Sequence, residues 1–143
     1  MATRNTLHVE VVTAERELYN GEADIVDAPG SEGQLGILPE HAPLLALLGP
    51  GPLQIKLHGE DNIFFVSSGF LEVSHDRVTI LADTAEHAAE IDQARAEAAR
   101  RRAQEHLEEA RSNTERAELQ AALLRAISRL KVVELARRSG RIR

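Results

Sequence analysis

Glycine and proline are distributed very unevenly along this chain of 143 residues. All five prolines and eight of the nine glycines lie before residue 70, whereas the 56 residues from Thr84 to Ser139 contain neither. Proline removes a backbone hydrogen-bond donor and glycine adds conformational entropy, so a long stretch without either can be helical. Fourteen of these 56 residues are alanine, which has the highest helix propensity. The distribution therefore divides the chain into an N-terminal part and a helical C-terminal part.

The N-terminal part has the pattern of short β-strands. Apolar and polar residues alternate in LHVEVV (7–12) and LQIKLH (53–58), and a period of two indicates strands with one buried face. Asn20-Gly21 is the strongest short hairpin signal, and further turns are expected at 59–61 and 74–76. Short strands separated by turns at regular spacing predict a sandwich or a barrel.

The C-terminal part has the pattern of two helices. Apolar residues recur at spacings of three and four within 96–110 and again within 119–133. Between these segments Ser112 and Glu115 fit a capping box, which predicts a turn near residues 111–114 and an antiparallel helical hairpin. Either Asp83 or Asp92 can cap the first helix. The fold class is thus α+β, with a β domain at 1–84 and a helical hairpin at 85–143.

One stripe of the hairpin consists mostly of alanine, which buries little area. Apolar burial contributes roughly 25 cal/mol per Å², so an alanine contact holds its partner less firmly than a leucine contact. Two interpretations follow: the hairpin is permanently docked, or it can leave the β domain and pack elsewhere.

Composition excludes several kinds of site and partner. The chain has no cysteine, which excludes disulfides, thiolate metal sites and cysteine nucleophiles. No apolar run approaches the roughly 20 residues that span a bilayer, so contact with a membrane is expected only through a partner. Residues 1–91 carry 4 basic and 15 acidic side chains, whereas residues 92–143 carry 13 and 8. The acidic N-terminal part makes nucleic acid a poor partner.

The stretch GSEGQLGILPEHAPL (30–44) has glycines three residues apart, as some phosphate-binding loops do. Gly36 is followed directly by Ile37 and not by lysine, and Pro39 and Pro43 forbid a regular helix, so neither a P-loop nor a dinucleotide fingerprint fits. His41 lacks partners at catalytic or metal-ligand spacing. We therefore expect turns and edges of a β domain here, with His41 as a surface or contact residue, and no catalytic or metal-binding residues in the chain.

The arginines of the C-terminal part are candidates for an anion site. Arg125 and Arg129 are four residues apart, and in a folded hairpin Arg95 and Arg102 of the first helix could converge with them. The alternatives are a solvated basic face or a face that meets an acidic protein.

Four motifs in this order and spacing resemble the epsilon subunit family of bacterial F-type ATP synthases, whose mitochondrial counterpart is called delta. They are GQLGILPEHAPLL (33–45), SSGFLEV (67–73), VTILAD (78–83) and AEIDQARA (89–96). The resemblance extends from about residue 5 to 137. It implies an antiparallel β-sandwich of about ten strands followed by a helical hairpin, in a non-catalytic subunit of the rotor's central stalk.

The family's partners imply surfaces on the β domain. Members bind the gamma subunit and the ring of membrane c subunits, so this chain is expected at the cytoplasmic face of the bacterial inner membrane as a peripheral part of the complex. The residues that this resemblance assigns to the gamma and c-ring contact are Gly33, Gln34, Leu35, Gly36, Glu40, His41 and Pro43. Many relatives have an acidic residue in place of Gln34, so an ion pair at that position is not implied.

In this family the hairpin is regulatory. It lies beside the sandwich, or it extends toward the alpha and beta subunits of the catalytic head and blocks ATP hydrolysis. No cofactor is required, but some relatives bind ATP on the folded hairpin through Ile/Leu-Asp-x-x-Arg-Ala. The matching residues here, with further positions by ungapped continuation, are Glu86, Ile91, Asp92, Arg95, Ala96, Arg102, Arg125 and Arg129. ATP would be a sensed ligand and not a substrate.

Overall fold

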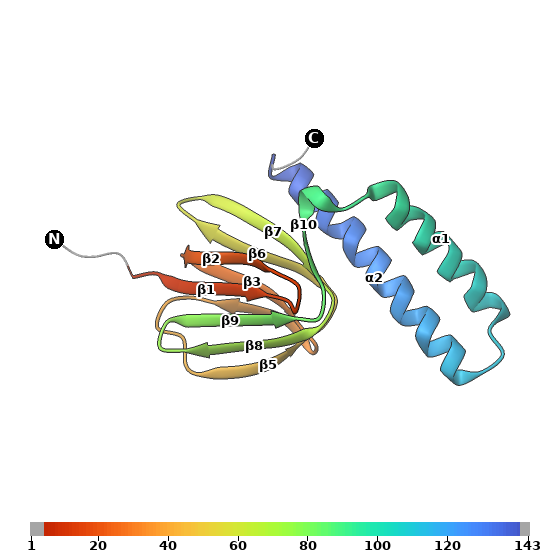
Figure 1. The fold of residues 1–143 in the computed structure, drawn as a ribbon, viewed down its shortest axis with the longest axis horizontal. Helices are drawn as coiled ribbons and strands as arrows, with labels where there is room; N and C mark the ends of the chain where they lie inside the picture. Colours follow the sequence, from red (N-terminus) through yellow and green to blue (C-terminus); the bar gives the residue numbers. More distant parts are fainter. Residues whose placement is uncertain (1–4, 141–143) are drawn as a thin grey trace.

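The computed structural model describes residues 5–140, and it confirms a β domain followed by a helical hairpin (Figure 1). Residues 1–4 and 141–143, at the outer ends of the two predicted domains, lie outside the described residues. The described strands are β1 (Leu7–Val12), β2 (Glu17–Ala23), β3 (Ile25–Gly30), β4 (Gly33–Ile37), β5 (Leu44–Leu48), β6 (Gly51–Leu57), β7 (Glu60–Val66), β8 (Gly69–Ser74), β9 (Arg77–Ala82) and β10 (Ala85–His87). A single 3-10 turn, η1 (Ala88–Glu90), then leads to helices α1 (Gln93–Glu109) and α2 (Asn113–Arg138).

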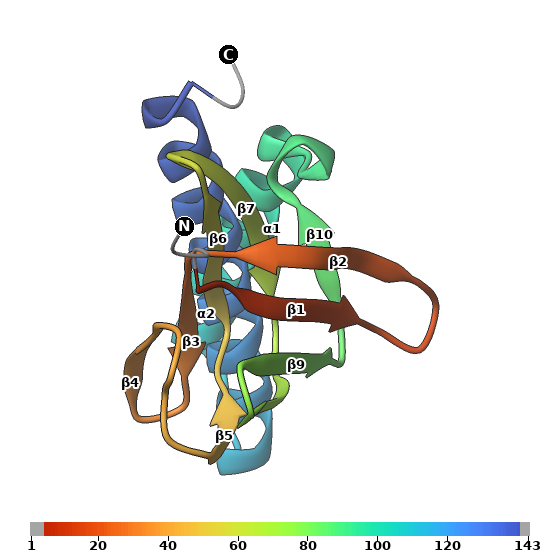
Figure 2. The ribbon, with the colours of Figure 1, turned by 90° about the vertical axis from the view of Figure 1, so that its left-hand side faces the viewer.

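The strands form one sheet that folds over on itself. Its order is β10-β7-β6-β3-β5-β8-β9-β1-β2, with β4 paired to β3. The neighbouring strands pair antiparallel except β1 and β9, which come from opposite ends of the domain and pair in parallel. In Figure 2, β1, β2 and β9 lie at the front and run across the direction of β6 and β7 behind them, and the mostly aliphatic core lies between these layers. Because β10 pairs with β7, the sheet extends three residues beyond the boundary expected at residue 84.

The alternating pattern is confirmed in β1, where every second side chain is buried. Two of the expected turns are also present. The β6–β7 turn has positive φ at His58 and Gly59, and the β8–β9 turn has positive φ at His75 and Asp76. Two consecutive positive φ values match the twist of the flanking strands in a tight hairpin.

The turn predicted at Asn20-Gly21 is wrong. Both residues lie inside β2 and pair with Glu10 and Val9 of β1. The chain reverses at Thr13–Arg16 instead, where the Thr13 amide donates to the Arg16 carbonyl at 2.9 Å and the Arg16 amide donates to Thr13 Oγ1 at 3.2 Å. Pairing along the whole of β1 outweighs the local preference of an Asn-Gly dipeptide.

The predicted helix starts are largely confirmed. Asp92, not Asp83, caps α1, because its side chain accepts from the Arg95 amide at 3.0 Å. Ser112 caps α2 by accepting from the Glu115 amide at 3.1 Å. The Glu115 carboxylate returns to the amide of Arg111, one residue earlier than in a capping box.

The two helices do not touch the β domain equally. α2 lies against the β domain, and α1 packs on α2 at the outside of the molecule (Figure 1). α1 buries only two residues, both alanines: Ala96 and Ala103. The contact of α2 with the β domain instead contains Val132 and Ala136, which cluster with Ile63, Phe65 and Ala88. The alanine stripe therefore joins the helices to each other, and a separate small apolar cluster docks the hairpin.

Candidate functional site

A pocket of about 370 Å³ lies where the connection between the domains meets both helices. We call it the linker pocket. Its lining is Glu86, Glu90, Ile91, Asp92, Arg95, Ala96, Ala99 and Arg129. Six of the eight residues assigned to the ATP motif thus line one pocket, because the N-terminus of α1 lies beside the C-terminal half of α2, where Arg137 donates to Gln93 at 2.8 Å.

The other two residues of that motif lie elsewhere. Arg102 is exposed on α1 and lines neither neighbouring pocket. Arg125 lines a second pocket of about 490 Å³ between α2 and the β domain, which includes Pro50, Ser67 and Thr84. Arg129 lines both pockets and therefore lies at the boundary between them.

Arg129 is held in place by two contacts with the β domain. Its Nε donates to Glu86 Oε1 at 2.9 Å, and the guanidinium carbon lies 4.5 Å from the centre of the buried Phe65 ring. The bond to Glu86 uses one of the five N–H donors of a guanidinium. A fixed guanidinium in a partly enclosed space is suited to binding an anion, because its orientation is already set.

Three residues of the motif also have structural roles that need no ligand. Asp92 caps α1, and Ile91 packs against the cluster that contains Phe65 and Val132. Ala96 is 5% exposed in α1, where a larger side chain would push the helices apart. Because these structural roles explain the three residues without a ligand, only the arginines of the motif are evidence for a binding site.

A pair that sequence reasoning missed borders the linker pocket. Arg16 donates from Nη1 to Glu90 Oε2 at 2.9 Å and from Nη2 to Glu90 Oε1 at 2.8 Å. Both side chains are 42% exposed. The hydrogen bonds from Arg16, followed by the bond from the His87 amide, lower the pKa of Glu90 from 4.5 to about 2. The only sequence signal was that Arg16 is one of four basic residues before residue 92.

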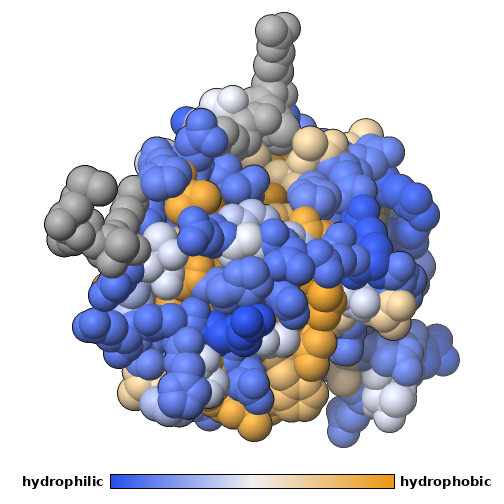
Figure 3. Space-filling view, turned by 60° about the vertical axis from the view of Figure 1, so that its left-hand side comes forward, coloured by the Kyte–Doolittle hydropathy of each residue, from blue (hydrophilic) through white to orange (hydrophobic). Residues whose placement is uncertain are grey.

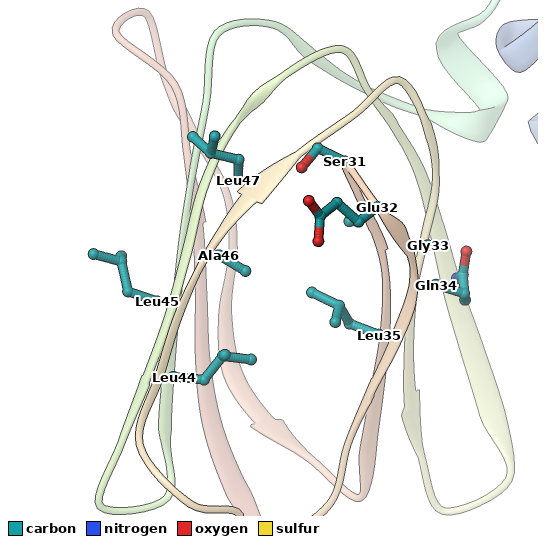
Figure 4. Close-up of a pocket in the computed structure, with 10 residues that line it drawn as sticks. Ser31, Glu32, Gly33, Gln34, Leu35, Leu44, Leu45, Ala46 and Leu47 are labelled. Atoms are coloured by element: carbon teal, nitrogen blue, oxygen red, sulfur yellow. The ribbon is translucent and has the colours of Figure 1, made fainter.

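The predicted contact residues of the β domain lie on β4 and the loop that follows it. Gly33, Gln34 and Leu35 line an open pocket of about 510 Å³ between β4 and β5. In Figure 4 the side chains of Leu35, Leu44 and Ala46 point into this opening, whereas Gln34 and Leu45 point away from it. Gly36 pairs with Asp27 in the β3–β4 hairpin.

The remaining predicted contact residues, Glu40, His41 and Pro43, lie in the loop before β5. Glu40 has a φ of 68°, and its amide donates to Asp76 Oδ1 at 2.6 Å. The His41 ring donates from Nδ1 to the Ala42 carbonyl at 2.6 Å. These bonds fix the loop next to the β8–β9 turn, so the loop presents a defined surface.

An exposed apolar row crosses three strands and was not predicted. Leu47 of β5 pairs with Phe70 of β8, which pairs with Leu81 of β9. These side chains are 56%, 50% and 52% exposed, and Leu45 extends the row. Figure 3 shows apolar patches interrupting the hydrophilic surface on one side of the molecule. The alternation of apolar and polar residues predicted which face of a strand is buried, but it did not predict that apolar residues would also gather on the exposed face.

Two kinds of feature are absent from residues 5–140. No helix there is both long and apolar enough to cross a lipid bilayer. Within the same residues, no group of three or more His, Asp or Glu side chains is arranged to hold a metal ion.

Comparison with known proteins covers both parts of the chain. Residues 6–88 match the family model for the beta-sandwich domain of the ATP synthase Delta/Epsilon chain, and residues 89–134 match the one for its long alpha-helix domain. The ATP synthase epsilon chain of Laribacter hongkongensis (strain HLHK9) is 48% identical over 136 residues, which is 94% of this chain and 97% of that relative.

Two solved structures share the fold. A chain of the Euglena gracilis mitochondrial ATP synthase superposes with a TM-score of 0.80 at 20% identity, covering 95% of this chain and 84% of that one. A chain of the Tetrahymena thermophila mitochondrial ATP synthase central stalk and c-ring superposes with a TM-score of 0.59 at 16% identity, covering 94% and 98%.

The lowered pKa of Glu90 predicts a pH-dependent contribution to stability. A folded-state pKa of about 2, below the ordinary 4.5, means that the ionised carboxylate stabilises the fold above about pH 4.5. This contribution is lost as the pH falls toward 2. We expect the difference in unfolding free energy between the wild type and Glu90→Gln to be constant above pH 5 and to shrink below pH 4. Urea unfolding at several pH values measures it, and a difference of equal size at pH 3 and pH 6 would contradict the assignment.

Proposed function

The chain belongs to the ATP synthase delta/epsilon family, and on that premise we propose that it is a non-catalytic subunit of the central stalk, coupling rotation of the c ring to the catalytic head. The observation that carries the proposal is the match of both domains to this family over residues 6–134. The two-part architecture supports it, since a closed β domain can stay bound to a rotor while a lightly attached hairpin moves.

The surfaces of the β domain supply two docking sites in this proposal. The apolar row of Leu45, Leu47, Phe70 and Leu81 meets the gamma subunit, because exposed apolar side chains grouped on one face are typical of protein interfaces. The β4 region and its loop, Gly33–Pro43, meet the polar loops of the c ring. The chain then reaches the cytoplasmic face of the bacterial inner membrane through the complex and not by insertion.

The hairpin inhibits ATP hydrolysis when it leaves the β domain. Its docking contact buries few side chains, chiefly Val132 and Ala136 against Phe65 and Ile63. Residues 92–143 carry 13 basic and 8 acidic side chains, which suits acidic loops of the beta subunits in the head. The hairpin exchanges its few contacts with the β domain for contacts with the catalytic head, so both the docked and the extended position can be populated.

A second proposal is that the linker pocket binds ATP as a regulatory ligand. It is supported by the presence of Arg95 and the oriented Arg129 in one pocket. A ligand that binds only the docked hairpin shifts the population toward that state in proportion to its differential affinity. ATP is then neither a substrate nor a required cofactor.

The inhibitory role predicts the effect of removing the hairpin. Deleting residues 92–143 leaves the β domain, with both proposed docking surfaces, so the truncated chain should still assemble. ATP hydrolysis by the reconstituted complex should rise relative to the complex with the full chain. Subunit content measured by gel and hydrolysis measured by phosphate release are the two readouts. Normal assembly with unchanged hydrolysis would exclude inhibition by the hairpin.

The regulatory-ligand role predicts heat on mixing the full chain with ATP. Arg129→Gln should weaken binding roughly tenfold or more, since a hydrogen bond to a charged group contributes about 1.5–3 kcal/mol. Arg111→Gln, at the exposed turn between the helices, is the matched control and should bind as the wild type does. Isothermal titration calorimetry checks both variants. No heat at millimolar ATP, or equal binding by Arg129→Gln, would reject this role.

A further inference from the structure

The Arg16–Glu90 pair joins two segments that are 74 positions apart in sequence. Arg16 lies in the turn before β2, and Glu90 is the last residue of η1, between β10 and α1. β2 and β10 are the two ends of the strand order, and they touch where the sheet folds over. The pair therefore lies at the junction from which the hairpin leaves the β domain.

Local hydrogen bonds fix the backbone on both sides of the Arg16–Glu90 pair. Arg16 is fixed by the Thr13–Arg16 turn, in which its amide donates to Thr13 Oγ1 and its carbonyl accepts from the Thr13 amide. Glu90 Oε1 also accepts from the His87 amide at 2.8 Å, which closes η1. Because both backbones are set by local bonds, the pair loses less conformational entropy than two mobile surface side chains would.

Arg16 binds a backbone carbonyl as well as the Glu90 carboxylate. Its Nη2 also lies 3.3 Å from the Ala85 carbonyl of β10, so one guanidinium binds the strand and the turn that follows it. Glu90 and Glu86 both line the linker pocket, so the same contact fixes one wall of that pocket. β10 has only three residues to hold this segment by strand pairing with β7.

We propose that Arg16 and Glu90 form a latch that fastens residues 85–91 to the β domain and thereby favours the docked hairpin. These residues are the covalent connection to α1, so displacement of the hairpin bends or frees them. The latch needs no nucleotide and stands apart from the ATP proposal. Its consequence for hydrolysis rests on the proposed inhibitory role of the hairpin.

Amide hydrogen exchange of the full chain tests the latch without any partner. When reclosing is fast, the exchange rate of an amide is proportional to its opening equilibrium. Arg16→Gln removes the charge and should raise exchange at residues 88–91 by roughly two- to fivefold, the size expected for a partly exposed pair. The amide of Ile91, which donates to the Ala88 carbonyl, reports on this segment directly.

A matched control is available within α1. Arg100 and Glu97 form an ion pair at 2.8 Å with side chains 31% and 41% exposed, but both lie on one helix. Arg100→Gln should leave exchange at 88–91 unchanged. Amides of β3 and β6 in the core should exchange at wild-type rates in every variant, which shows that the β domain remains folded.

A double-mutant cycle separates the pair from its individual residues. If the two side chains act together, Arg16→Gln combined with Glu90→Gln should exchange no faster than the faster single variant. Wild-type exchange in Arg16→Gln, or effects that multiply in the double variant, would overturn the latch.

The assembled complex supplies the second measurement. With the latch weakened, the extended arm is more populated, so Arg16→Gln should lower ATP hydrolysis while Arg100→Gln does not. Faster amide exchange at residues 88–91 with unaltered ATP hydrolysis would support the latch and contradict the inhibitory role of the hairpin. Unchanged amide exchange at these residues would contradict the latch, whatever the rate of hydrolysis.

Discussion

The contact between α2 and β7 determines where the hairpin lies on the β domain. Val132 and Phe65 are both fully buried in it, and full burial of a valine contributes roughly 1.5–3 kcal/mol. This contact sets the position of α2, and α1 in turn packs on α2. The linker pocket exists only while α2 stays there, because Arg129 comes from α2 and Glu86 from β10. Docking of the hairpin and formation of the pocket are therefore one event.

Several polar contacts surround this apolar contact and fix the orientation of α2 on the β domain. Arg129 bonds to Glu86, Ser128 donates to the Pro50 carbonyl at 3.3 Å, and Arg16 secures the connecting segment through Glu90. The two ion pairs are partly exposed, so solvent screens them and neither makes docking permanent. A small apolar contact with several weak polar ones is suited to the proposed release of the hairpin without unfolding of the β domain.

Local patterns in the sequence predicted the elements well and their contacts less well. The period of two located β1, and Ser112 located the start of α2, since each depends on neighbouring residues. The Asn20-Gly21 turn failed because pairing with β1 overrides a dipeptide preference. Helical periodicity also predicted the alanine stripe. It did not predict that the stripe packs on the other helix, because periodicity shows which residues share a face but not what packs against that face. Arg16 and Glu90 were missed for the same reason: nothing in a sequence signals a contact across 74 positions.

In the proposed function the hairpin alternates between this docked position and an inhibitory one. The most direct measurement uses Pro50→Cys with Ser128→Cys, two positions already in contact in a chain that has no other cysteine. Crosslinking them in the assembled complex holds α2 on the β domain. ATP hydrolysis should be high while the link is intact and lower once a reductant breaks it, because the released hairpin can then reach its inhibitory position. Equal rates before and after reduction would contradict this alternation.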